Sequence, residues 1–307
     1  MRIEALRIEN GRCLDLERQP QPSAAMQEGL LAVLAEPDVT LHVPAGAVAL
    51  WCPLAGELRL GIDDGGSTIG RLSINRGVVC VSDDERTRTT AVLHGGAAIA
   101  VLGKHPSWSR ALSAYDAASL PVPAIFPQNV QAAPGARRRM VAFVHAALCG
   151  DAGWRLAELA RAVQAMQAPL TACIDRSPGR SASRRRQLFL RFQRVRQRMA
   201  LNPRHDLDVP ALARMVNYST WQFIKVFHQI YGETPYAYLL RCRVEHAQRL
   251  IVRSELGIGE VARESGFESR ATFNRVFKEH TGIPPSALRS AALMGAAGRP
   301  DARMRAG

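Results

Sequence analysis

Two segments near the end of the chain carry polar side chains at a helical spacing that suits contact with nucleic acid. Guanidinium, ammonium, amide and hydroxyl groups can hydrogen-bond to base edges and phosphates when one helical face presents them together. The first segment presents Thr220, Trp221, Ile224, Lys225 and His228, and the second presents Arg270, Ala271, Thr272, Asn274, Arg275 and Lys278. The opposite faces are apolar, with Phe223, Val226, Phe227 and Ile230 in one and Phe273, Val276 and Phe277 in the other. Their spacing predicts a buried core and not a platform for base stacking.

The two segments belong to a diverged internal duplication. Leu212-Ala213-Arg214 matches Val261-Ala262-Arg263, and the match continues to Pro235 and Pro285. An internal repeat of this length indicates one supersecondary unit used twice. Each copy predicts a short helix, a turn and a longer helix, which together make a helix-turn-helix unit.

Other residues predict how these units are held. Asn217 and Gly266 fall in the two turns, where a residue must adopt a positive φ. Tyr236–Arg253 forms one long helical pattern between the copies, which would fix their separation. Before the first copy, one apolar stripe predicts an amphipathic helix that ends at Asn202-Pro203 with its arginines in solvent. The stripe consists of Leu188, Phe192, Val195 and Met199.

The net charge of +13 is concentrated in the same part of the chain. Residues 1–183 hold 18 Lys and Arg against 17 Asp and Glu, whereas residues 184–290 hold 19 against 9, a net charge of +10. A basic domain beside a neutral one indicates a polyanionic partner, and charge alone leaves DNA, RNA and an anionic membrane open. The arginine run at 184–186 is interpreted as surface of a linker.

The motifs in the second copy resemble the AraC/XylS family of transcription regulators. The resemblance covers residues 188–290 and rests on Gly257-Ile258-Gly259-Glu260-Val261-Ala262, Ser265-Gly266-Phe267-Glu268-Ser269, Thr272-Phe273-Asn274-Arg275-Val276-Phe277-Lys278, Gly282 and Pro285. It implies seven helices and two recognition helices that face successive major-groove segments of double-stranded DNA. By this likeness the positions nearest the bases are Trp221, Ile224, Lys225, Ala271, Thr272, Asn274 and Arg275. The chain departs from the family pattern at Asn217, Thr220, His228 and Leu288, which leaves the operator sequence open.

The N-terminal part has the pattern of a small antiparallel β-barrel or jelly roll. Apolar runs alternate with Gly-rich and Asp-rich turns over residues 39–103, with Gly95-Gly96 as a hairpin turn. Weakly, this sheet resembles the cupin-like effector domain that often accompanies the DNA-binding unit. Metal-dependent cupins carry a His-x-His pair, but His42, His94 and His105 stand alone. We therefore expect no metal and no catalytic residue. A cupin-type small-molecule enzyme with an accessory DNA-binding domain is the alternative.

The predicted fold class is α+β, with five segments in order. Residues 1–136 form the effector domain, including a proline-rich strap over residues 117–136, and residues 137–174 form a helical hairpin. Residues 175–187 are a linker, 188–290 the DNA-binding domain and 291–307 a flexible tail. The apolar stripe of the hairpin predicts a homodimer. A small-molecule effector and RNA polymerase are further candidate partners, and no cofactor is indicated.

The pattern of cysteines and the hydropathy of the chain predict the cellular location of the protein. The six cysteines include no Cys-x-x-Cys pair, which is typical of reduced thiols in a protein core. Prolines interrupt the longest uncharged runs, unlike a membrane-spanning helix. We therefore expect a soluble cytoplasmic protein without a membrane partner.

Overall fold

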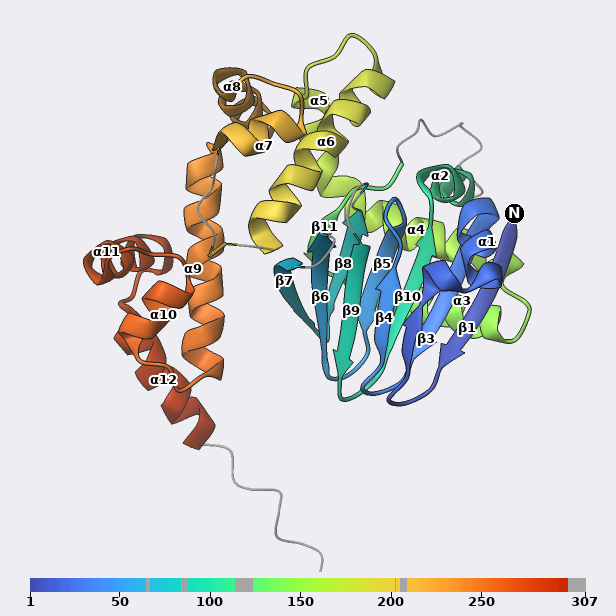
Figure 1. Cartoon of the computed structure of the whole chain (residues 1–307), viewed down its shortest axis with the longest axis horizontal. Helices are drawn as coiled ribbons and strands as arrows, with labels where there is room; N and C mark the ends of the chain where they lie inside the picture. Colours follow the sequence, from blue (N-terminus) through green and yellow to red (C-terminus); the bar gives the residue numbers. More distant parts are fainter. Residues whose placement is uncertain are drawn as a thin grey trace, which may run out of the picture.

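The computed structural model describes residues 1–64, 67–83, 85, 88–113, 124–201, 203–204 and 209–297. Two sheets and the helices packed on them occupy one side of the molecule, and a group of helices beyond residue 182 occupies the other (Figure 1). The coarse prediction of an α+β chain with a helical C-terminal part is therefore confirmed.

The strands form two separate mixed sheets. The larger sheet has the order β1-β3-β10-β5-β8-β11, and the smaller has the order β2-β4-β9-β6-β7. The strands are β1 (Arg2–Ile8), β2 (Cys13–Asp15), β3 (Gly29–Ala35), β4 (Thr40–Val43), β5 (Val48–Pro53), β6 (Glu57–Asp64), β7 (Ser67–Asn75), β8 (Val78–Asp83), β9 (Arg88–His94), β10 (Ala98–Gly103) and β11 (Gln128–Gln131). Within the described ranges the two sheets share no strand, so they do not close into one barrel, and the cupin-like barrel or jelly roll stays a prediction. The pairs β1–β3 and β2–β4 are parallel because α1 (Pro20–Glu28) intervenes along the chain, and parallel pairing needs such a crossover.

Alternation along the strands of the larger sheet builds two cores. On β5, Ala49 and Trp51 face the smaller sheet, while Val48, Leu50 and Cys52 face the helices. Both sets are buried, so this sheet is covered on each face. The molecule therefore stacks the smaller sheet, the larger sheet and a helical layer.

The turn at Gly95-Gly96 differs from the prediction. It joins β9 to β10, which lie in opposite sheets, so it is a crossing between sheets and not a hairpin. Gly56 lies against it with φ +75°, and a Cβ placed there would come within 1.6 Å of the Gly95 carbonyl oxygen. The two short connections between the sheets thus need glycine because their backbones pass so close.

The expected helical hairpin is formed by α3 (Pro134–Leu148) and α4 (Leu156–Gln167), and α2 (His105–Ser113) packs beside them. The stripe that predicted a dimer surface faces inward. Met140, Val144, Leu159 and Val163 are buried against the larger sheet of the same chain. The sheet already covers this stripe, so the stripe does not supply a surface for the homodimer, which stays a prediction.

The connecting segments also differ in detail. Residues 117–123 of the predicted strap and 298–307 of the predicted tail lie outside the described residues, and α12 (Pro285–Ala297) occupies the start of that tail. Within the strap, the backbone of Phe126 exchanges two hydrogen bonds with the Gln167 side chain, at 3.0 and 2.9 Å. α5 (Thr171–Arg176) precedes the linker, and residues 182–187 form the first turns of α6 (Ala182–Leu201) instead of linker.

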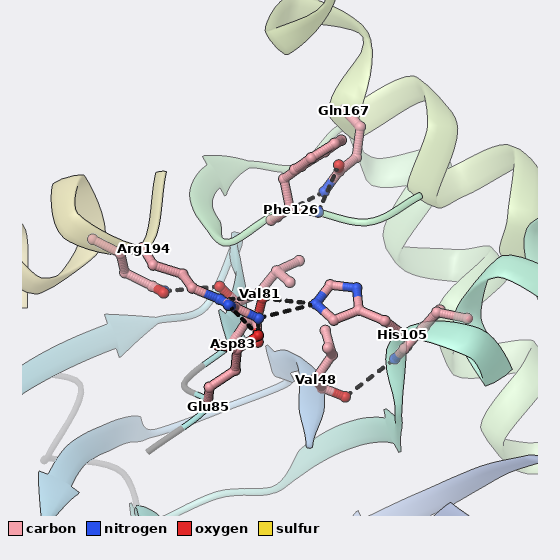
Figure 2. A network of polar contacts seen from close by, with 10 residues as sticks. Val48, Val81, Asp83, Glu85, His105, Phe126, Gln167 and Arg194 are labelled. Atoms are coloured by element: carbon pink, nitrogen blue, oxygen red, sulfur yellow. Dashed lines mark hydrogen bonds and ion pairs between the residues drawn. The ribbon is translucent and has the colours of Figure 1, made fainter. Parts of the chain in front are cut away.

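A buried polar network joins α6 to the sheets (Figure 2). Arg194 donates two hydrogen bonds of 2.9 Å to the carboxylate of Asp83 at the end of β8, and His105 Nε2 lies 2.9 Å from the same carboxylate. Burial by itself would raise the pKa of Asp83, but the His105 and Arg194 contacts outweigh it and lower that pKa. The carboxylate is therefore charged at neutral pH and binds the two parts of the molecule together.

Two glutamines of α6 add to this contact between α6 and the sheets, which we call the seam. Gln197 donates to the Val81 carbonyl and Gln193 to the Pro127 carbonyl, each at 2.8 Å. Both glutamines are buried. The apolar stripe predicted for α6 is buried as expected, but the face expected in solvent is in part an interface with the sheets.

Candidate nucleic-acid interface

The first helix-turn-helix unit consists of α7 (Val209–Met215) and α8 (Thr220–Tyr231). Asn217 in the turn has φ 59°, as predicted, and amide-bearing Asn tolerates this left-handed region better than most residues. Ser219 caps α8 by accepting a hydrogen bond from Gln222 N, and the Gln222 side chain accepts one from Ser219 N. Gly232 ends the helix at φ 76°.

The second unit repeats this construction with α10 (Ile258–Glu264) and α11 (Arg270–Thr281). Gly266 in its turn has φ 80°, and a Cβ there would lie 2.9 Å from Arg243 Nε and from the Pro203 carbonyl oxygen. Glycine is thus required both for conformation and for the close approach of α9 and the segment before α7. Ser269 caps α11 by accepting from Thr272 N at 3.1 Å.

The aromatic residues of both recognition helices form the predicted cores. Phe223, Phe227, Phe273 and Phe277 are fully buried. Phe223 stacks on Phe192 of α6 with ring centroids 5.6 Å apart, so the first unit is anchored on the helix that contacts the sheets. The prediction that these rings belong to the core is confirmed.

The long helix α9 (Pro235–Arg253) separates the two units. At 1.5 Å per residue it is about 28 Å long, close to one turn of duplex DNA at about 34 Å. α8 lies near one end of α9 and α11 lies beside its other half, on the side away from the sheets (Figure 1). In the described residues from 182 to 297 there are seven helices, as the resemblance implies.

Each residue predicted to face nucleic acid is exposed. The set comprises Thr220, Trp221, Ile224, Lys225, His228, Arg270, Ala271, Thr272, Asn274, Arg275 and Lys278. Trp221 retains 69% of its accessible surface and Ile224 38%, which is unusual for large apolar side chains at a helix surface. The structure thus gathers these residues on two solvent-facing helix faces.

The two faces differ in charge and in side-chain contacts. On α8, Lys225 Nζ lies 5.0 Å from the centre of the Trp221 ring, a cation–π contact. On α11, Arg275 pairs with Glu279 at 2.9 Å, four residues along the helix. Ser269 Oγ also donates to the Thr272 hydroxyl at 2.9 Å. The first face offers an ammonium over an aromatic ring, and the second a guanidinium held by a carboxylate.

Sequence reasoning missed Glu279 and Ser269 as neighbours of the second face. The spacing of Arg275 and Glu279 could have identified the first, because side chains four apart on a helix meet. Such an exposed pair is weak, so the guanidinium can exchange its carboxylate for another acceptor.

A half-buried histidine, His246, lies on α9. Burial, together with the positive charges of Arg249 and Arg204, lowers the pKa of His246 to about 4. Burial likewise lowers the pKa of Arg249. His246 is therefore neutral at pH 7, and its neighbourhood resists any further positive charge.

Two histidines of the N-terminal part contact other side chains. His42 Nδ1 lies 3.0 Å from Thr90 Oγ1, and His105 is bound to Asp83. Among the described residues there is no group of three or more His, Cys, Asp or Glu that could hold a metal ion. A search of the same residues finds no helix with the length and apolar character to span a membrane.

Two such units on one spacer helix define a helix-turn-helix DNA-binding domain. Residues 212–291 match a protein-family model described as "Helix-turn-helix domain". The curated proteins that match this domain are named as transcription regulators.

Two curated relatives illustrate the extent of the likeness. An uncharacterized HTH-type transcriptional regulator of Haemophilus influenzae is 32% identical over 87 residues, which cover 28% of this chain and 29% of its own. The MmsAB operon regulatory protein of Pseudomonas aeruginosa is 29% identical over 92 residues, 30% of each chain. The matched region thus spans less than a third of the length of these relatives.

Solved structures give matches of two kinds. The DNA-binding domain of AdpA in complex with a target DNA is 28% identical, with a TM-score of 0.34, and the match covers 36% of this chain and 98% of that one. ToxT of Vibrio cholerae, bound to a naphthalenyl butenoic acid, is 12% identical with a TM-score of 0.34 over 86% of this chain and 98% of its own.

Proposed function

We propose that this chain is a sequence-specific DNA-binding transcription regulator. The observation that carries the proposal is the pair of exposed recognition faces, on α8 and α11, at two places along one helix of about 28 Å. Binding should be of nanomolar-range affinity and should weaken steeply with salt, because residues 184–290 carry a net charge of +10 and would displace condensed counterions.

The two faces should divide the work of recognition. The guanidinium of Arg275 can donate two parallel hydrogen bonds to guanine O6 and N7, worth about 1–3 kcal/mol of discrimination. The ammonium of Lys225 lies over Trp221 and beside Ile224, so it is a point charge among apolar groups. We therefore propose that Arg275 reads bases, with Asn274 and Thr272 beside it, and that Lys225 contacts a phosphate.

A randomised-operator selection with the wild type, Arg275→Ala and Lys225→Ala tests this assignment. Arg275→Ala should relax base preference at one or two positions, whereas Lys225→Ala should weaken binding evenly and leave the motif unchanged. Glu279→Gln is a matched control, since it removes the partner of Arg275 and should preserve the motif. The reverse pattern for the two variants would overturn the assignment, and a lack of preference over random duplex would overturn the function itself.

Spacing supplies an independent test. The two contacted segments should lie about 10 bp apart on one face of the DNA. Inserting about 5 bp moves one segment to the opposite face, which a rigid α9 cannot follow. Binding should therefore fall strongly, while an insertion of about 10 bp tests whether the separation itself matters. Harmless insertion of the half turn would refute a rigid two-unit arrangement.

The N-terminal part supplies the remainder of the proposal. We propose that the two sheets form a cupin-like sensor domain that responds to a small-molecule effector. Homodimer formation, contact with RNA polymerase and action in the cytoplasm stay predictions. Sedimentation of the full chain at increasing concentration tests the homodimer, and a constant monomer mass would refute it. Stoichiometric zinc or iron with turnover of a small molecule would favour the alternative enzyme.

A further inference from the structure

A groove on the outer surface of α3 is unrelated to the recognition faces. It has a volume of about 650 Å³ and is lined by α3, the turn after it and the β7–β8 turn. The helix α3 packs on the larger sheet through its inner face, so the groove lies on the face that the core does not use. A volume of this size suits a small organic ligand.

The lining combines an apolar floor with an excess of positive charge. Val141, Ala142 and Trp154 contribute apolar surface, and Trp154 retains 57% of its accessible area. The lining also includes four arginines, namely Arg76, Arg137, Arg138 and Arg155. Its one carboxylate, on Asp151, accepts a hydrogen bond from Trp154 Nε1 at 3.1 Å.

The arginines have little to neutralise them. Arg155 pairs with Glu158 at 2.7 Å and stacks over the Trp154 ring at 3.9 Å. Among the described residues, Arg76, Arg137 and Arg138 form no ion pair with a carboxylate. Arg137 Nε is buried and makes no hydrogen bond there, although the Arg137 side chain also contacts the buried thiol of Cys52. A buried donor without an acceptor is costly, which favours an acceptor supplied by a ligand.

From this arrangement we infer that the groove binds an amphipathic organic acid, a carboxylate on an aromatic or branched aliphatic body. The body packs on Val141 and Trp154, and the carboxylate accepts hydrogen bonds from Arg137 and Arg138. An inorganic anion has no apolar group, so it would leave the apolar side chains of the groove exposed to water. A second copy of the chain related by a two-fold axis would place this arginine-rich patch against itself, with like charges facing.

Binding of the aryl carboxylate ibuprofen, compared with its neutral amide, tests the inference. Calorimetry on the full chain without DNA should show one site for the acid, with the amide at least about tenfold weaker, because a charge-assisted hydrogen bond is lost. Arg138→Gln should raise the Kd of the acid about tenfold. Arg139→Gln is the matched control: it is the next residue on α3, exposed and outside the groove lining, and should leave the Kd unchanged.

Several results would overturn this proposal. They are the absence of saturable binding of the acid at millimolar concentration, equal binding of acid and amide, or equal effects of Arg138→Gln and Arg139→Gln. If Arg138→Gln instead changes the sedimentation of the free protein, a second copy occupies the groove and the proposed ligand is wrong.

The binding of the ligand does not depend on the proposed function. Only a role of the ligand in regulating DNA binding rests on it. Ligand binding is measured without DNA, and operator selection is measured without ligand, so failure of one leaves the other intact. Arg138→Gln should select the same operator as the wild type. If the acid binds and also changes operator affinity in the wild type but not in Arg138→Gln, the groove is an effector site.

Discussion

Removing the carboxylate of Asp83 should destabilise the molecule far more than removing its neighbour on the same arginine. Asp83 has 1% of its side chain exposed and accepts from Arg194 and His105, whereas Glu85 reaches Arg194 at 2.6 Å with 66% exposed. Breaking a buried pair leaves an uncompensated charge, at a cost of about 3–5 kcal/mol. Glu85 still faces Arg194 in Asp83→Ala, so we expect the lower end, about 3 kcal/mol.

The matched control is Glu85→Gln. Because this carboxylate is exposed, its ion pair is screened by water and should contribute no more than about 1 kcal/mol. Both variants are measured by urea unfolding of the full chain at pH 7. The double variant Asp83→Ala with Arg194→Met removes both charges, and its cost should fall below the sum of the single variants by about 1–3 kcal/mol.

Two outcomes would refute this reasoning. If Asp83→Ala costs no more than Glu85→Gln, burial does not strengthen the contact between α6 and β8. If the single variants add without coupling, then Asp83 and Arg194 act independently, and the 2.9 Å contacts do not carry the stability of the seam.

Two further predictions concern backbone conformation and pH. Asn217→Ala should destabilise by about 1 kcal/mol, because a Cβ-bearing residue without the Asn amide is strained at φ 59°, while Asn217→Gly should be neutral or stabilising in the same urea assay. For His246 the folded pKa of about 4 lies below the ordinary 6.5, so the unfolded chain takes up the proton first. The free energy of unfolding should therefore fall between pH 6.5 and 4, and His246→Asn should flatten that decline; an unchanged pH profile would contradict it.

The helix-turn-helix units could be predicted closely because their determinants are local and occur twice. The buried Phe positions, the positive φ of Asn217 and Gly266 and the span of α9 all follow from patterns within a few residues. A residue type that recurs at the same place in both copies indicates a requirement of the fold and not a coincidence. The exposed faces follow from the same periodicity, since a residue outside the apolar stripe must point to solvent.

The fold of the N-terminal part was harder to predict because its strands pair with strands that are distant in the sequence. β3 reads Gly-Leu-Leu-Ala-Val-Leu-Ala without alternation, since both its faces are buried, and such a run cannot be told from a helix by periodicity. β1 pairs with β3 only after α1 has crossed between them. A pattern read along the chain also cannot show how the strands divide between two sheets.

The polar face of α6 was misjudged for a related reason. The sequence places Arg194 in solvent because it lies between the apolar positions of the stripe. Its partner Asp83 lies 111 positions earlier in the chain, and only the fold brings them together. The partial burial of this arginine therefore depends on the tertiary fold, which neighbouring residues do not reveal.

The seam constrains how the sheets could influence DNA binding. α6 contacts β8 through Arg194, and at the far end of α9 Arg253 donates to the Asn75 side chain at 3.3 Å. The recognition faces are exposed while these contacts are in place, so DNA contact does not require the two parts to separate. A ligand changes affinity only as far as it binds two arrangements of the chain differently. An effector that acts through the contact between the sheets and the helices would therefore have to change the contacts at Arg194 and Arg253.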